Sequence, residues 1–83
     1  MSDIAVVVRD FIIGCDEGSL FTSTSRRLEK KLDSSLGLWW MGSCDKRAFI
    51  LNTLKKLVSE EYLRYKDYPL LPGQSYVFER TSK

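Results

Sequence analysis

The segment that most constrains the fold is DKRAFILNTLKKLVSE, residues 45–60. Its apolar residues recur at helical spacing and form one stripe: Ile50, Leu54 and Leu57, widened by Leu51 and Val58. The opposite side is polar or small: Asp45, Ala48, Asn52, Lys55, Lys56 and Ser59. We expect a helix capped by Ser43 or Cys44. The rest of the chain must supply an apolar surface that covers its stripe.

Two earlier segments predict helices that can do so. The first begins near Ser2 or Asp3, has apolar residues at Val7, Val8, Phe11 and Ile12, and ends at Gly14. Thr22 or Thr24 can cap the second, which we expect to run to about Asp33. Its inner face carries Leu28 and Leu32, four residues apart.

The C-terminal part changes to the period of a strand. Leu63 and Tyr65 alternate with Arg64 and Lys66, and SYVFER returns as an extended segment after a loop with two prolines and a glycine. We therefore expect a hairpin over residues 62–79. Three helices followed by a hairpin, mainly α with a small β part, predict a single winged helix-turn-helix domain over residues 1–83. A three-helix bundle with a tail and an unrelated α+β domain stay as alternatives.

Composition narrows the class of function. The chain has 83 residues, two cysteines and no histidine. It lacks a Gly-rich phosphate loop, a paired-carboxylate motif and an activated Ser or Cys, so we expect no enzyme. Zinc would require more soft ligands, and we expect no metal, cofactor or small-molecule ligand. The thiols of Cys15 and Cys44 are expected to be reduced. No apolar run is long enough to span a bilayer, and no signal peptide is expected.

Charge is distributed unevenly along the chain. Residues 1–19 carry one basic and four acidic side chains, a net −3, whereas residues 20–66 carry ten basic and five acidic, a net +5. The remainder balances, so the total is +2. A basic middle segment indicates an anionic partner.

The region from about Val7 to Val58 also resembles the DEK C-terminal domain family. The matching features are the Asp16-Glu17 turn with Leu20, the cap Thr22, and the residues Arg26, Arg27, Leu28, Lys30, Leu32 and Asp45 to Ile50. The resemblance implies a helical, winged-helix-like fold, a nuclear, chromatin- or transcription-associated protein (cytoplasmic if not eukaryotic), DNA binding and self-association. The chain departs from that pattern in two places: SSLGLWWMGSC lengthens the link between two helices, and a hairpin follows Glu61.

In a helix-turn-helix protein the third helix enters the major groove and the second crosses the backbone. Asn52, Lys55 and Lys56 are then the exposed groups expected to face the groove. Phosphate contacts are expected from the start of the third helix, from the second helix and from the wing: Lys46 and Arg47; Arg26, Arg27, Lys30 and Lys31; Arg64 and Lys66.

Trp39 and Trp40 are the only tryptophans, and they are adjacent. If a short strand forms there, alternation buries one ring against Phe11 or Leu54 and turns the other outward. An exposed Trp beside Leu38 and Met41 is typical of a protein-binding surface. Two functions therefore stay open. One is duplex DNA binding in a chromatin or transcription setting, and the other is a winged-helix interaction module that docks other subunits through Trp39 and Trp40.

Overall fold

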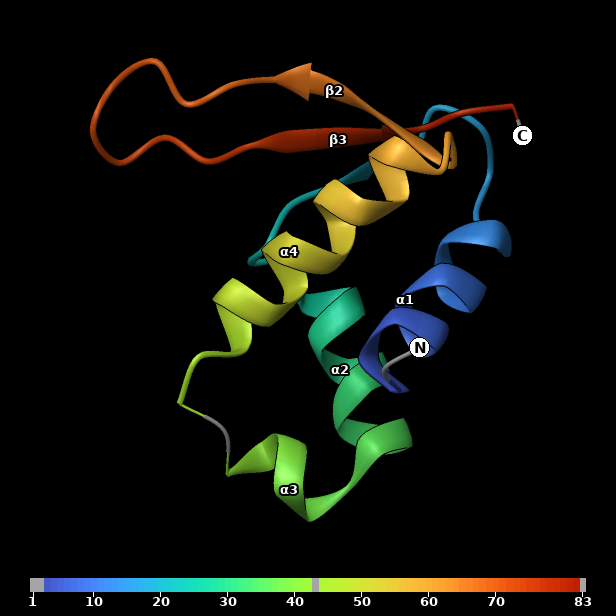
Figure 1. Cartoon of the computed structure of the whole chain (residues 1–83), viewed down its shortest axis with the longest axis vertical. Coiled ribbons are helices and arrows are strands. Elements are labelled where there is room, and N and C mark those ends of the chain that lie inside the picture. The colour runs from blue at the N-terminus through green and yellow to red at the C-terminus, as the bar shows by residue number, and fades with distance from the viewer. Residues whose placement is uncertain (1–2, 43, 83) are drawn as a thin grey trace.

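The computed structural model describes residues 3–42 and 44–82, which form helices and short strands (Figure 1). The described residues form four helices and three strands, in the order α1 (Asp3–Ile13), β1 (Leu20–Phe21), α2 (Arg26–Leu36), α3 (Leu38–Met41), α4 (Lys46–Ser59), β2 (Leu63–Asp67) and β3 (Val77–Arg80). The radius of gyration is 12.3 Å, close to the value of about 12 Å for a compact body of this length. The chain is thus mainly helical, with a small sheet.

The sheet is antiparallel, with β3 between β1 and β2. Phe78 of β3 lies opposite Phe21 of β1 on one side and opposite Tyr65 of β2 on the other. The register shifts between Tyr65 and Asp67, which leaves Lys66 as the extra residue of a bulge. Strand β3 therefore joins β1, from the N-terminal part of the chain, and β2 in one sheet.

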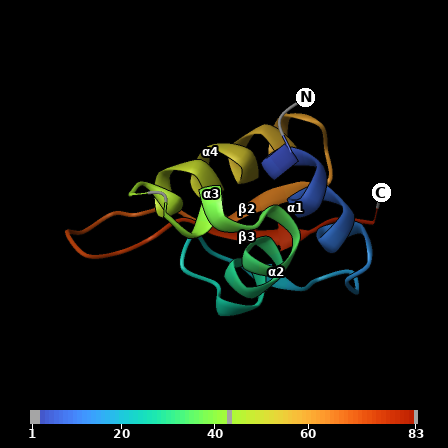
Figure 2. The same cartoon turned by 90° about the horizontal axis from the view of Figure 1, so that it is seen from below.

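Every element contributes to one core. Residues at four-residue spacing on each long helix turn inward and meet one or two residues from each shorter element. The cluster contains Ile4, Val8, Ile12, Phe21, Leu28, Leu32, Trp40, Ile50, Leu54, Leu57, Leu63 and Phe78. In Figures 1 and 2, α1, α2 and α4 pack together, the sheet lies at one end of this group and α3 lies at the other. The inner faces predicted for the three long helices are confirmed.

Several predicted boundaries were wrong. Ser25, not Thr22 or Thr24, precedes α2, and α2 continues beyond Asp33 to Leu36. Asp45, not Cys44, precedes α4, and Ser43 lies outside the described residues. The Thr22 and Ser25 hydroxyls instead hold the preceding turn: the Thr24 N–H donates to Thr22 Oγ1 at 3.2 Å, and the Thr22 N–H donates to Ser25 Oγ at 2.8 Å.

The number of helices and the place of the third strand also differ from expectation. The link containing the tryptophans is the four-residue helix α3, not a strand. The extra strand is β1, which comes earlier, between α1 and α2. A segment of two residues has no period of its own, and Leu20 and Phe21 become a strand only because β3, from the other end of the chain, pairs with them.

The chain reverses sharply between α4 and β2. Glu61 has a positive φ of 71°, the Tyr62 N–H donates to the Leu57 carbonyl at 3.0 Å, and the Glu61 N–H donates to the Val58 carbonyl at 3.0 Å. These two bonds form the left-handed helix ending that usually requires glycine. The Thr81 hydroxyl donates to the Glu61 carbonyl at 2.6 Å, which ties this reversal to the end of β3.

Arg80 is a buried charged residue at the end of the central strand β3. Its Nε donates to the Ile12 carbonyl at 2.9 Å, in the last turn of α1. A cation is favourable there because helix C-termini carry partial negative charge. Its backbone also pairs with the turn before β1: the Gly18 N–H donates to the Arg80 carbonyl at 2.9 Å, and the Arg80 N–H donates to the Ser19 carbonyl at 2.8 Å.

Replacing Arg80 with Met should destabilise the protein by about 1–3 kcal/mol, because the Ile12 carbonyl loses a buried, charged donor. Urea unfolding followed by circular dichroism measures this as a lower midpoint at unchanged slope. The control is Arg64→Met. Arg64 is an exposed arginine of the same sheet that pairs with Glu79, and its loss should cost less than about 1 kcal/mol. Equal costs for the two variants would show that the Arg80 contact does not anchor β3.

Candidate functional site

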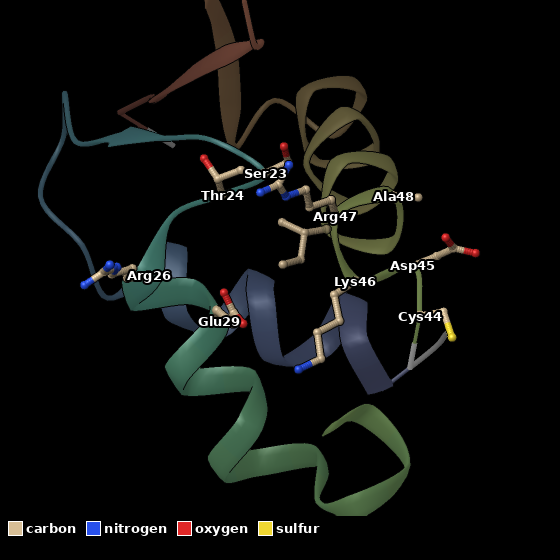
Figure 3. A pocket seen from close by; sticks show the side chains of 10 residues that line it. Ser23, Thr24, Arg26, Glu29, Cys44, Asp45, Lys46, Arg47 and Ala48 are labelled. Atoms are coloured by element: carbon tan, nitrogen blue, oxygen red, sulfur yellow. The ribbon is translucent and has the colours of Figure 1, made fainter. Parts of the chain in front are cut away.

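The first turns of α2 and α4 border one pocket of about 660 Å³. It is lined by residues of the turn before α2, the first turns of α2 and α4 and the approach to α4: Ser23, Thr24, Arg26, Glu29, Cys44, Asp45, Lys46, Arg47, Ala48 and Ile50. Figure 3 shows the Arg47 side chain reaching toward Ser23, while Arg26 extends from the other wall, away from α4. The lining carries three basic side chains and two carboxylates, so its net charge is +1.

Both helices start at this pocket without a side-chain cap. Neither Ser25 nor Asp45 makes a capping hydrogen bond. The Ser25 hydroxyl instead accepts the Thr22 N–H. The first N–H groups of a helix lack partners within the helix and carry partial positive charge. They add to the attraction that Arg26 and Arg47 exert on an anion here.

The four basic residues of α2 lie on two sides of the helix. Arg26 and Lys30 border a shallow hollow with Glu29 and Asp33. Arg27 and Lys31 border another, next to α1, and the Arg27 guanidinium lies 5.5 Å from the centre of the Phe11 ring. Arg26 therefore borders the pocket shared with α4, although its side chain extends away from α4, whereas Arg27 and Lys31 border the hollow next to α1.

Lys46 contacts an acidic and an aromatic side chain of the protein, so its ammonium is less available to a phosphate than that of an unpaired lysine. Its Nζ lies 3.6 Å from Asp33 Oδ1 and 5.8 Å from the centre of the Trp40 ring. The side chain is only 25% exposed. It joins α4 to α2 and α3, a role that the sequence analysis did not predict.

The predicted exposure of Lys55 was wrong. This side chain is half-buried, with its Nζ 4.7 Å from the centre of the Tyr76 ring, next to β3. Asn52 and Lys56 are exposed as predicted. Lys55 lies about 80° around the axis of α4 from Arg47, since the two are eight residues apart, whereas Lys56 lies about 180° from Arg47. We call Ser23, Thr24, Arg26, Arg47 and Lys55 the α2–α4 face.

Strand β2 carries two basic residues, one paired with an acidic residue and one exposed to solvent. Arg64 Nε forms an ion pair with the Glu79 carboxylate on the neighbouring strand. Lys66 is exposed at the bulge. We predicted both residues in the wing but not the Arg64–Glu79 ion pair, because a partner on the neighbouring strand depends on the register of the sheet.

The two tryptophans differ as predicted. Trp40 is fully buried, with its ring centre 6.2 Å from that of Phe49, whereas Trp39 is 54% exposed. Neighbouring apolar side chains are exposed as well, and together with Trp39 they form what we call the α3 patch: Leu38, Trp39, Met41 and Phe49. Helix α3, which carries three of these four residues, lies at the end of the molecule opposite the sheet (Figure 1).

Sequence reasoning missed two groups of residues. Ser23 and Thr24 line the pocket, but the sequence suggested no role for Ser23 and only helix capping for Thr24. The loop between β2 and β3 exposes Tyr68, Leu70 and Leu71. The signal was present in the sequence, because no charged residue occurs between Asp67 and Glu79.

Other kinds of site find no support in the described part of the chain. No group of three His, Cys, Asp or Glu residues is placed to hold a metal ion. Cys15 is half-buried and Cys44 is exposed, and both are free. None of the helices described has both the length and the apolar character needed to cross a membrane.

No protein-family model, curated protein or solved structure matches this chain. The resemblance to the DEK C-terminal domain family therefore stays a prediction.

The exposure of the two indole rings can be measured separately. In Trp40→Phe only Trp39 remains, and its emission should be red-shifted and strongly quenched by acrylamide, because that ring is half exposed. In Trp39→Phe the remaining Trp40 should emit at shorter wavelength and resist quenching. Circular dichroism of both variants is the control for folding. Equal, weak quenching in two folded variants would mean that Trp39 is also core.

Proposed function

We propose that the chain is a winged-helix domain that binds duplex DNA in a chromatin- or transcription-associated protein. The order of its elements and the central position of β3 are compatible with that fold. In this assignment α4 is the recognition helix, α2 crosses the phosphate backbone, and the loop between β2 and β3 is the wing.

The observation that carries the proposal is that Arg26 and Arg47, from two different helices, both line one pocket. Arginine forks match phosphate geometry, and two uncapped helix starts add partial positive charge at the same place. Asn52 is exposed on α4 and has the amide that can pair with adenine in the major groove. Affinity would come from the arginines, and sequence preference from Asn52.

The test compares two double variants that remove the same charge. Arg26→Ala with Arg47→Ala should weaken binding to a fluorescein-labelled duplex by about tenfold, because charge-assisted contacts are lost. The slope of log affinity against log salt should fall by about 0.9 for each phosphate contact removed. Arg27→Ala with Lys31→Ala, on the side of α2 next to α1, should change affinity and slope much less. Fluorescence anisotropy between 50 and 200 mM salt gives both quantities, and this range is about that over which phosphate binding falls steeply.

Equal losses in the two double variants would mean that binding follows net charge and not the α2–α4 face. Absence of duplex binding by the wild-type protein at low salt would overturn the proposal.

A second function, that of a protein-docking module, has its own supporting observation. In the α3 patch Leu38 is 87% exposed and Trp39 is 54% exposed, and exposed apolar patches can mark protein interaction sites. The indole is a frequent anchor in protein interfaces. In this reading the partner is another subunit or a second copy of the chain, and the basic residues serve mainly for solubility.

A further inference from the structure

The loop between β2 and β3 exposes apolar side chains at its tip. Leu70 is 82% exposed and Leu71 is 66% exposed, and Tyr68 at the base is about half exposed. Residues 68–78 contain no charged side chain. In both views of the molecule this loop extends well beyond the helices (Figures 1 and 2). Two adjacent leucines on such a projection require a specific explanation.

The tip is ordered by its own hydrogen bonds. Gln74 Oε1 accepts the N–H groups of Leu70 and Leu71, at 2.9 and 3.1 Å. The Gln74 N–H donates to the Leu71 carbonyl at 3.2 Å, and Gly73 has the positive φ of 88° that this turn needs. The leucines are thus presented in a fixed shape, and little conformational entropy is lost when they enter a site.

Aromatic stacking holds the base of the loop. The rings of Tyr65 and Tyr68 stack with centres 4.9 Å apart, and Tyr76 lies 6.1 Å from Tyr68. The Lys55 ammonium lies over the Tyr76 ring, so the base of the loop touches the α2–α4 face. A duplex lying along Arg47 and Lys55 would meet the loop next to it.

We propose that this loop enters the minor groove of the duplex, where Leu70 and Leu71 act as an apolar wedge that partly unstacks one base step. This inference rests on the proposed DNA-binding function. Apolar side chains inserted between base steps bend DNA in proteins that bind the minor groove. The tip has the required chemistry, and Lys55 and Lys66 stand near its base, where the phosphates would lie. Leucine is under-represented among the residues that dominate protein interfaces, so a protein partner fits this tip less well.

A duplex with 2-aminopurine in a TA step tests the wedge, because such steps unstack easily and the base fluoresces when it is unstacked. Binding of the wild-type protein should raise the fluorescence. Leu70→Ser with Leu71→Ser should remove the rise and weaken binding by about tenfold, since apolar burial is lost. The salt slope should stay unchanged because no charge is removed, unlike that of the arginine double variant.

The matched control is Leu38→Ser with Met41→Ser, which removes two exposed apolar side chains from the α3 patch. This variant should bind and unstack the duplex as the wild type does. Circular dichroism checks that both variants are folded.

Each other outcome has a separate meaning. Tight duplex binding without a fluorescence rise, and unchanged affinity of the loop variant, would overturn the wedge and leave the proposed function intact. No duplex binding by the wild type would overturn both. Loss of self-association in the loop variant, with duplex binding unaffected, would assign the tip to a protein contact and overturn the wedge.

Discussion

The pairing of β3 with both of its neighbours is the constraint on which the rest of the structure depends. This four-residue strand forms its hydrogen bonds with β1, near the start of the chain, and with β2, which follows α4. Phe78 of β3 is part of the hydrophobic core, and Arg80 Nε donates to the Ile12 carbonyl in the last turn of α1. Without β3, β1 and β2 would have no strand between them, and the sheet that contacts α4 through β2 would not form.

Packing of the fold divides the basic residues into those that contact other side chains and those that are exposed to a ligand. Lys46 contacts Asp33 and Trp40, and Arg64 pairs with Glu79, so these cations contribute to packing and register. Arg26 and Arg47 are exposed and share one pocket. A net charge of +2 therefore understates what one face presents, because position decides which charges meet a ligand. The proposed DNA contact rests on these two arginines more than on the total charge.

Much of the fold followed from helical periodicity, whereas contacts between distant segments did not. The stripes with Ile12, Leu28 and Leu54 predicted three long helices and their inner faces, and alternation predicted the hairpin. β1 was not predictable, since two residues become a strand only through a partner from the far end of the chain. Unequal burial of the two tryptophans was predicted, but for the wrong reason, because a strand was expected. In the helix α3 neighbouring side chains diverge by about 100°, which also leaves one ring buried and the other exposed. At the candidate site, Arg26 and Arg47 were identified, but the engagement of Lys46 and Lys55 depends on Asp33, Trp40 and Tyr76, whose proximity no local pattern encodes.

The central claim is that the α2–α4 face and the adjoining loop bind duplex DNA. Amide chemical-shift mapping of the ¹⁵N-labelled protein during titration with a short duplex tests it most directly. We expect the largest shifts in residues 23–26, 47–55 and 68–76, decreasing together as salt is added, because phosphate binding is weakened by salt. Shifts confined to residues 38–41 and Phe49, or no shifts at low salt, would contradict the account.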